Sequence, residues 1–171
     1  MGLFGFVMGL GKSQEQKMTI WILEHTQKHI AKMTMNSSAF WDTCKRNPNR
    51  KSEIQDWTGA AFISHFITCL VTEIGKNWED VYMIFASNIS SNMRNLIAEC
   101  TNKFNTSLSS EAEIVDDSRF KCAEWLWSKM FFWNSMMSIQ TIDAHEDFIK
   151  AFTDECLAVR AEIIPFKEKF M

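Results

Sequence analysis

The 171-residue sequence has few of the turn-forming residues that all-β proteins use, and it lacks the patterns of β-sheets and repeats. It contains six glycines and two prolines, and four of the glycines fall within residues 1–12. No alternating apolar and polar run of useful length occurs, and there is no internal repeat or low-complexity segment. These absences exclude a β-sheet protein and a repeat protein, and they favour a single all-α domain with one shared core.

Cysteine is present, but in no pattern that forms a metal cluster or a disulfide framework. The five cysteines lie far apart, none belongs to a C-x-x-C pair, and their number is odd. This usage excludes a zinc ribbon and a disulfide-rich secreted scaffold, and it indicates a reducing compartment. We therefore expect a cytoplasmic protein in which cysteine acts as a small buried apolar side chain.

Long uncharged runs and a basic overall composition are also missing. The segment 57–72 carries no formal charge when its histidine is neutral, but its 16 residues fall short of the roughly 20 that span a bilayer, so it predicts a buried helix. The net charge is −3, with an excess of basic residues confined to positions 1–51. An acidic chain with one basic end is not expected to bind nucleic acid.

Helix-start signals recur along the chain and predict a bundle of five helices. A capping residue followed three positions later by Gln, Glu or Asp opens each helix, and apolar residues then recur at three- and four-residue spacing. The expected helices span 13–33, 53–74, 77–104, 110 to a turn at 138–141, and 143–163, with a linker at 102–109. Pro165 is expected to end or bend the last of them.

The fourth expected helix is nearly all apolar and is predicted to be the central helix of the bundle. Residues 119–139, RFKCAEWLWSKMFFWNSMMSI, hold three of the seven tryptophans. A helix that is apolar nearly all round must be covered on several sides. Trp125 and Trp127 lie about 200° apart around a helix, so both cannot face one partner. We expect one of them to belong to the core and the other to be available for a contact.

Aromatic side chains are the candidate partner-binding residues. The chain divides into an apolar, glycine-rich N-terminal tail, residues 1–12, and a helical bundle domain, residues 13–171. Surfaces rich in tryptophan and methionine are typical of sites where a helix or an apolar ligand docks. The predicted contact residues are Trp125, Trp127, Phe132, Phe4 and Phe6.

The histidines support a second hypothesis, a metal or haem pocket. His25 and His29 are one helical turn apart, a spacing at which two imidazoles can bind one ion. His145 would supply a third ligand if the first and last helices are neighbours. Against this, the glutamate of the metalloprotease signature is missing, and core-facing histidines are usually neutral and hydrogen-bonded.

No catalytic signature is complete. His65 and Cys69 are one turn apart, but no third residue is evident that would orient the base. Acidic pairs such as Asp154 and Glu155 are expected on solvated helix faces. The sequence therefore favours a non-enzymatic module that binds a protein partner or self-associates through an aromatic and methionine-rich face, without a cofactor. The alternatives are a bundle that holds an apolar ligand, metal or haem, and peripheral membrane attachment through residues 1–11.

Overall fold

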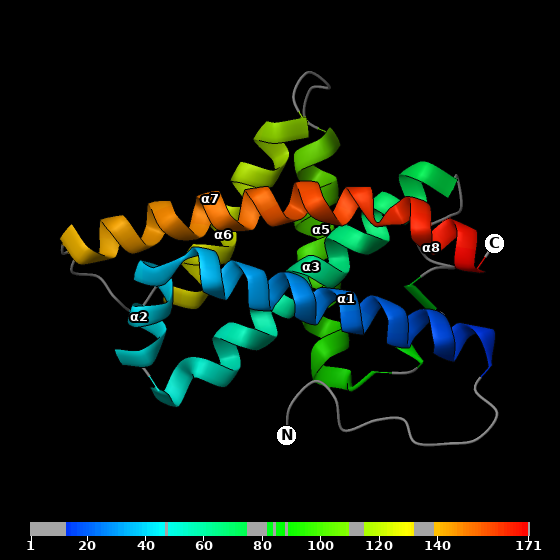
Figure 1. The fold of residues 1–171 in the computed structure, drawn as a ribbon, viewed down its shortest axis with the longest axis horizontal. Coiled ribbons are helices and arrows are strands. Elements are labelled where there is room, and N and C mark those ends of the chain that lie inside the picture. The colour runs from blue at the N-terminus through cyan, green and yellow to red at the C-terminus, as the bar shows by residue number, and fades with distance from the viewer. Residues whose placement is uncertain are drawn as a thin grey trace.

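All the regular structure of the described residues is helical. The computed structural model describes residues 13–46, 48–74, 82–83, 85–87, 89–109, 115–131 and 139–170. In chain order its elements are α1 (Gln14–Asn36), α2 (Ser38–Arg46), the short 3-10 helix η1 (Pro48–Arg50), α3 (Lys51–Ile74), α5 (Ser91–Ser109), α6 (Val115–Phe131), α7 (Ile139–Ala161) and α8 (Ile163–Phe170). The predicted all-α domain is confirmed, and the tail at 1–12 lies outside the described residues (Figure 1).

Helix α3 lies at the centre of the bundle. It packs against every other helix described above, whereas α6 packs against α3, α5 and α7. The eight consecutive residues 60–67 of α3 are all buried, which confirms the prediction of a buried helix in this segment. α1 and α7 lie side by side and run in opposite directions (Figure 1). The sequence prediction that the tryptophan-rich helix is the central one was therefore wrong.

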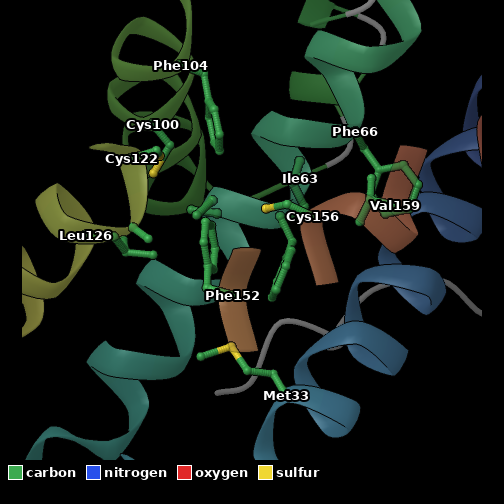
Figure 2. Packing of buried hydrophobic residues seen from close by; sticks show 14 of the residues in the cluster. Met33, Ile63, Phe66, Cys100, Phe104, Cys122, Leu126, Phe152, Cys156 and Val159 are labelled. Carbon is green, nitrogen blue, oxygen red and sulfur yellow. The ribbon is translucent and has the colours of Figure 1, made fainter. Parts of the chain in front are cut away.

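The core is built mainly from phenylalanine. Phe62, Phe66, Phe104, Phe148 and Phe152 are almost completely buried, and each such side chain contributes roughly 1.5–3 kcal/mol by leaving water. Figure 2 shows part of this packing, with Ile63 of α3 beside Cys156 of α7. All five cysteines are buried and none forms a disulfide, as the sequence predicts.

Hydroxyl groups inside α3 bond back to the helix itself. Thr58, Thr68 and Thr72 each donate to the carbonyl oxygen four residues earlier, at 2.8–2.9 Å. The Ser64 hydroxyl lies 2.7 Å from the Ala60 carbonyl oxygen and 2.9 Å from the Ile97 carbonyl oxygen of α5. A buried hydroxyl must find an acceptor, and these bonds explain how a helix with this many polar groups can be central.

The predicted capping box at the start of α1 is confirmed. The Ser13 hydroxyl accepts the Gln16 backbone N–H at 3.3 Å, and the Gln16 side-chain oxygen accepts the Ser13 N–H at 3.1 Å. Two of the amide groups that a helix start leaves without partners are thereby satisfied.

The number of helices exceeds the prediction of five, because α2 and α8 are separate elements. α2 begins where the Phe40 N–H donates to the Asp147 carboxylate of α7 at 3.3 Å. This carboxylate lies at the positive end of the helix dipole, where it stabilises a helix start. The partner is 107 residues away in the sequence, so no local pattern could reveal it.

Two expected boundaries around α5 were wrong. The helix expected to begin at Asn77 is interrupted by a turn at Ser87, and α5 begins only at Ser91, where the Ser90 hydroxyl accepts the Met93 N–H at 3.3 Å. The expected linker 102–109 forms the last turns of α5. Its polar composition suggested a loop, but the buried Phe104 anchors this end of the helix in the core.

The last expected helix is divided in two. α7 begins at Ile139 instead of Asp143, and it ends at Ala161, with a turn at Glu162 before α8. Pro165 explains the break, since its ring clashes with the carbonyl four residues earlier and it has no N–H to donate. Proline is tolerated in the first turn of α8, where amide groups have no helical partner. The prediction was that Pro165 ends or bends the helix, and the structure shows α7 ending at Ala161, before the proline.

Candidate functional sites

The two histidines of α1 meet two glutamates from the C-terminal part of the chain. His25 and His29 lie on α1, Glu155 lies on α7, and Glu162 forms the turn between α7 and α8. We call these four residues the histidine–glutamate cluster. α1 and α7 are neighbours, as the sequence hypothesis required of the first and the last expected helix, but the groups that face the histidines are carboxylates.

His29 is enclosed between both carboxylates. Its Nδ1 lies 2.6 Å from Glu155 Oε2, and its Nε2 lies 3.4 Å from Glu162 Oε1. The side chain of His29 is 0% exposed and its ring lies against Phe62 and Phe66. A charge enclosed by aromatic rings is expensive unless it is paired, so the two carboxylates decide the state of this imidazole.

His25 occupies the outer edge of the cluster. Its Nε2 lies 3.6 Å from Glu162 Oε2, and its Nδ1 donates to the Trp21 carbonyl oxygen at 2.8 Å. The ring stacks on Trp21 with 3.6 Å between centroids. Trp21 in turn packs edge-on against Phe166 of α8 at 5.0 Å. His25 and Trp21 thus join α1 to the turn and to α8.

The electrostatics of the cluster favour a protonated His29. Burial alone lowers the pKa of His29, but its interactions with Glu162 and Glu155 outweigh burial and raise this pKa above the ordinary 6.5. For Glu162 the directions are reversed. Burial raises the pKa of this carboxyl, but His29, His25 and Lys28 together lower it below the ordinary 4.5. The two shifts are consistent with an ion pair between His29 and Glu162.

His145 is not part of this cluster. It lies ten residues before Glu155 on the same helix, which corresponds to roughly 15 Å along the axis. Its ring packs instead against Trp127, with 5.2 Å between centroids. Within the described ranges, no group of three or more His, Cys, Asp or Glu side chains has the arrangement needed to hold a metal ion.

His65 and Cys69 do not form a nucleophile and base. His65 Nε2 lies 2.9 Å from the Cys156 carbonyl oxygen, which can only accept, so this nitrogen carries a proton. The same nitrogen is the one near the Cys69 sulfur, at 3.6 Å, and therefore cannot remove the thiol proton. Burial lowers the pKa of His65 to about 4, which keeps the ring neutral. This pair belongs to the core.

A second candidate site lies where α3, α5 and α6 meet. Trp57 and Trp125 pack edge to face, with centroids 5.8 Å apart. The Lys129 ammonium lies over both rings, 5.7 Å from Trp57 and 5.4 Å from Trp125, and also pairs with Glu99 of α5. Both indoles are half-buried. We call these four residues the tryptophan corner.

The other predicted contact residues fall in different places. Trp127 packs among Phe40, Phe131 and Phe148, with centroids 4.2–6.4 Å away, so its ring contributes to the aromatic core. Phe132, Phe4 and Phe6 lie outside the described residues. Trp125 also packs against the core, but its ring neighbours are Trp57 and Lys129.

Glu155 and Glu162 were missed by the sequence reasoning. The pair Asp154 and Glu155 was expected on a solvated face, but only Asp154 is exposed, whereas Glu155 is 7% exposed. A signal was present, since Glu155 lies three residues after the core residue Phe152 and therefore on its face of the helix. Glu162 carried the same signal, since it lies three residues after the buried Val159, but its contacts with the histidines depend on the turn that ends α7.

Comparison with models of known protein families, with characterised proteins and with solved structures finds no match for this chain.

In the part of the chain that the structure describes, no helix is both long enough and apolar enough to cross a membrane.

Proposed function

We propose that the protein is a cytoplasmic, non-enzymatic protein-binding module whose partner docks on the tryptophan corner. The observation that supports this most is the pair of half-buried indoles, Trp57 and Trp125, with a lysine ammonium over both rings. Tryptophan is among the residues most enriched at binding hot spots, because one ring offers a large apolar area and one N–H donor.

The corner is built on rigid elements. Trp57, Glu99 and Trp125 come from three helices that pack against one another. A side chain that is already held in place loses little conformational freedom when a partner arrives, so more of the contact energy remains available for binding. Trp127, on the same helix as Trp125, differs because its ring is already engaged with core phenylalanines.

The indole rings and the ammonium group of the tryptophan corner indicate what kind of partner surface it can bind. The two indole faces accept an apolar or aromatic side chain, and Lys129 offers a cation beside them. Lys129 is paired with the half-exposed Glu99, and such a surface pair contributes little to stability. We therefore expect Lys129 to exchange this partner for a carboxylate on the docking protein, next to an apolar anchor.

The proposal is tested by affinity capture from native cells with the tagged wild-type chain and a Trp125→Ala variant. Loss of a hot-spot tryptophan weakens binding by about tenfold or more. We expect a specific partner on the wild-type chain to be depleted to that extent on Trp125→Ala, as measured by quantitative mass spectrometry. Circular dichroism checks that the variant remains helical.

Phe120→Ala is the matched control. Phe120 lies on the same helix and is 45% exposed, so its removal deletes surface aromatic area outside the corner. We expect Phe120→Ala to retain the partner. Equal recovery of every protein by the wild-type chain and Trp125→Ala would contradict the proposal.

A further inference from the structure

The turn at Glu162 connects the C-terminal helix to α1 through charged groups. The break before Pro165 ends α7 and places the Glu162 carboxylate between the Nε2 atoms of His25 and His29, at 3.6 and 3.4 Å. Seven residues earlier in the sequence, about two helical turns, Glu155 reaches the other nitrogen of His29. Both glutamates and the start of α8 are therefore held by one side chain of α1.

Apolar contacts of α8 depend on the same placement. Phe166 is fully buried and packs edge-on against Trp21, and Phe170 packs against both Trp21 and Phe166. The backbone N–H of Phe166 donates to the Glu162 carbonyl oxygen at 3.1 Å, so α8 begins at the residue that faces the histidines. A displacement of Glu162 from His29 therefore moves the first turn of α8 away from Trp21.

The proton on His29 decides whether the electrostatic interactions within the cluster stabilise or destabilise it. With His29 protonated, its positive charge lies between two carboxylates. With His29 neutral, the two carboxylates still face its ring from both sides, but no positive charge between them compensates for their desolvation. Three further groups belong to the electrostatics of the cluster: His25 and Lys28 of α1 also lower the pKa of Glu162, and the charge of His29 lowers the pKa of the buried His65.

We propose that the histidine–glutamate cluster is a proton-dependent latch: protonated His29 holds Glu155 and Glu162 and keeps α8 packed on Trp21, and loss of this proton releases α8 from α1.

The direction of the pH dependence follows from the two shifts. The pKa of His29 is raised, so the stabilisation it provides is complete below the ordinary value of 6.5 and is lost as the pH rises through the folded value. The pKa of Glu162 is lowered, so its contribution is present above the ordinary value of 4.5 and is lost as the pH falls through the folded value. The latch is therefore closed between these limits and opens on the alkaline side.

The test measures, in the same sample, the protonation of His29 and the packing of α8 as the pH is changed. Histidine-selective NMR of the full chain reports the titration of His29 between about pH 5 and about pH 9. Amide hydrogen exchange of Ile163–Phe170, corrected for the intrinsic rate at each pH, reports the packing of α8. A chelator is present throughout. We expect protection of α8 to fall over the pH interval in which His29 loses its proton.

Two glutamate variants separate the latch from general alkaline loosening. Glu162→Gln removes the charge but keeps the size, so it should move the His29 titration and the loss of α8 protection to lower pH together. Glu168→Gln changes an exposed glutamate of α8 and should leave both midpoints where they are. If Glu162→Gln does not fold, Glu155→Gln tests the same coupling, and the wild-type profile remains decisive.

Three results would overturn the proposal. The first is α8 protection that stays constant while His29 titrates. The second is a Glu162→Gln variant in which the His29 midpoint moves and that of α8 does not. The third is restoration of α8 protection at about pH 8 by added zinc in place of the chelator, because the cluster would then be a metal site.

Discussion

At the scale of single residues, the histidines show how little a local sequence says about an ionisable group. His25 and His29 are one turn apart on α1, yet one stacks on Trp21 near the surface and the other is fully buried between carboxylates. His65 is buried beside a carbonyl oxygen and is neutral. The residue that pairs with His29 most closely is 126 positions away. The spacing of His25 and His29 identified the site, but only the fold could supply its chemistry.

The cysteines give a prediction at the same scale. Burial raises the pKa of Cys44 to about 12 and raises the pKa values of Cys100, Cys122 and Cys156 well above the ordinary 9.0. Since the thiolate is the reactive form, a thiol reagent at about pH 8 should leave these four residues unmodified in the native protein. All of them should react after unfolding in denaturant, as peptide mass spectrometry will report. Rapid stoichiometric labelling of native Cys122 or Cys156 would contradict this picture of the core.

At the scale of helices, α1 offers the clearest local prediction. Ser13→Ala removes the acceptor for the Gln16 N–H and should lower the free energy of unfolding by about 1 kcal/mol, measured by urea denaturation. Ser52→Ala is the control: the same S-x-x-Q pattern occurs there, but Ser52 is an exposed residue inside α3. Its replacement should change stability by less than about 0.5 kcal/mol. Equal losses for both variants would mean that the capping box contributes nothing specific.

These two serines also show which parts of the fold were predictable. The first start signal was correct, because a capping box satisfies local amide groups and needs no distant partner. The pattern at Ser52 misplaced the helix start, since α3 begins at Lys51 directly after η1. The burial of residues 60–67 followed from an uncharged run, which is again a local property. Boundaries set by tertiary contacts, such as the Asp147 carboxylate at the start of α2, were not predictable.

At the scale of the whole molecule, the choice of the central helix is the most informative error. The tryptophan-rich helix is more apolar to the eye, yet α6 exposes Phe120, Glu124 and Lys129. In α3 the hydroxyl groups of serine and threonine donate hydrogen bonds to carbonyl oxygens of the same helix. α3 can therefore be covered by other helices on all sides. The amino-acid composition of a helix does not show where its polar groups form hydrogen bonds. A prediction from composition therefore placed α6 at the centre of the bundle instead of α3.

The candidate sites were predictable to different degrees. The sequence predicted that Trp125 and Trp127 face different sides of one helix without saying which belongs to the core, and their rings do pack against different neighbours. The companions of Trp125 in the corner, namely Trp57, Glu99 and Lys129, come from three helices, so the corner as a unit exists only in the folded chain. The binding role of this corner is the central claim for the molecule as a whole.

That claim is tested most directly by site-specific photocrosslinking in living cells. A photoreactive phenylalanine analogue replaces either Trp125 or the exposed Phe120 on the same helix, and crosslinked species are identified by mass spectrometry. If a partner docks on the tryptophan corner, position 125 forms a discrete covalent adduct with one protein and position 120 does not. Identical crosslinking patterns at the two positions, or none at position 125 in cells that retain the folded protein, would contradict the account.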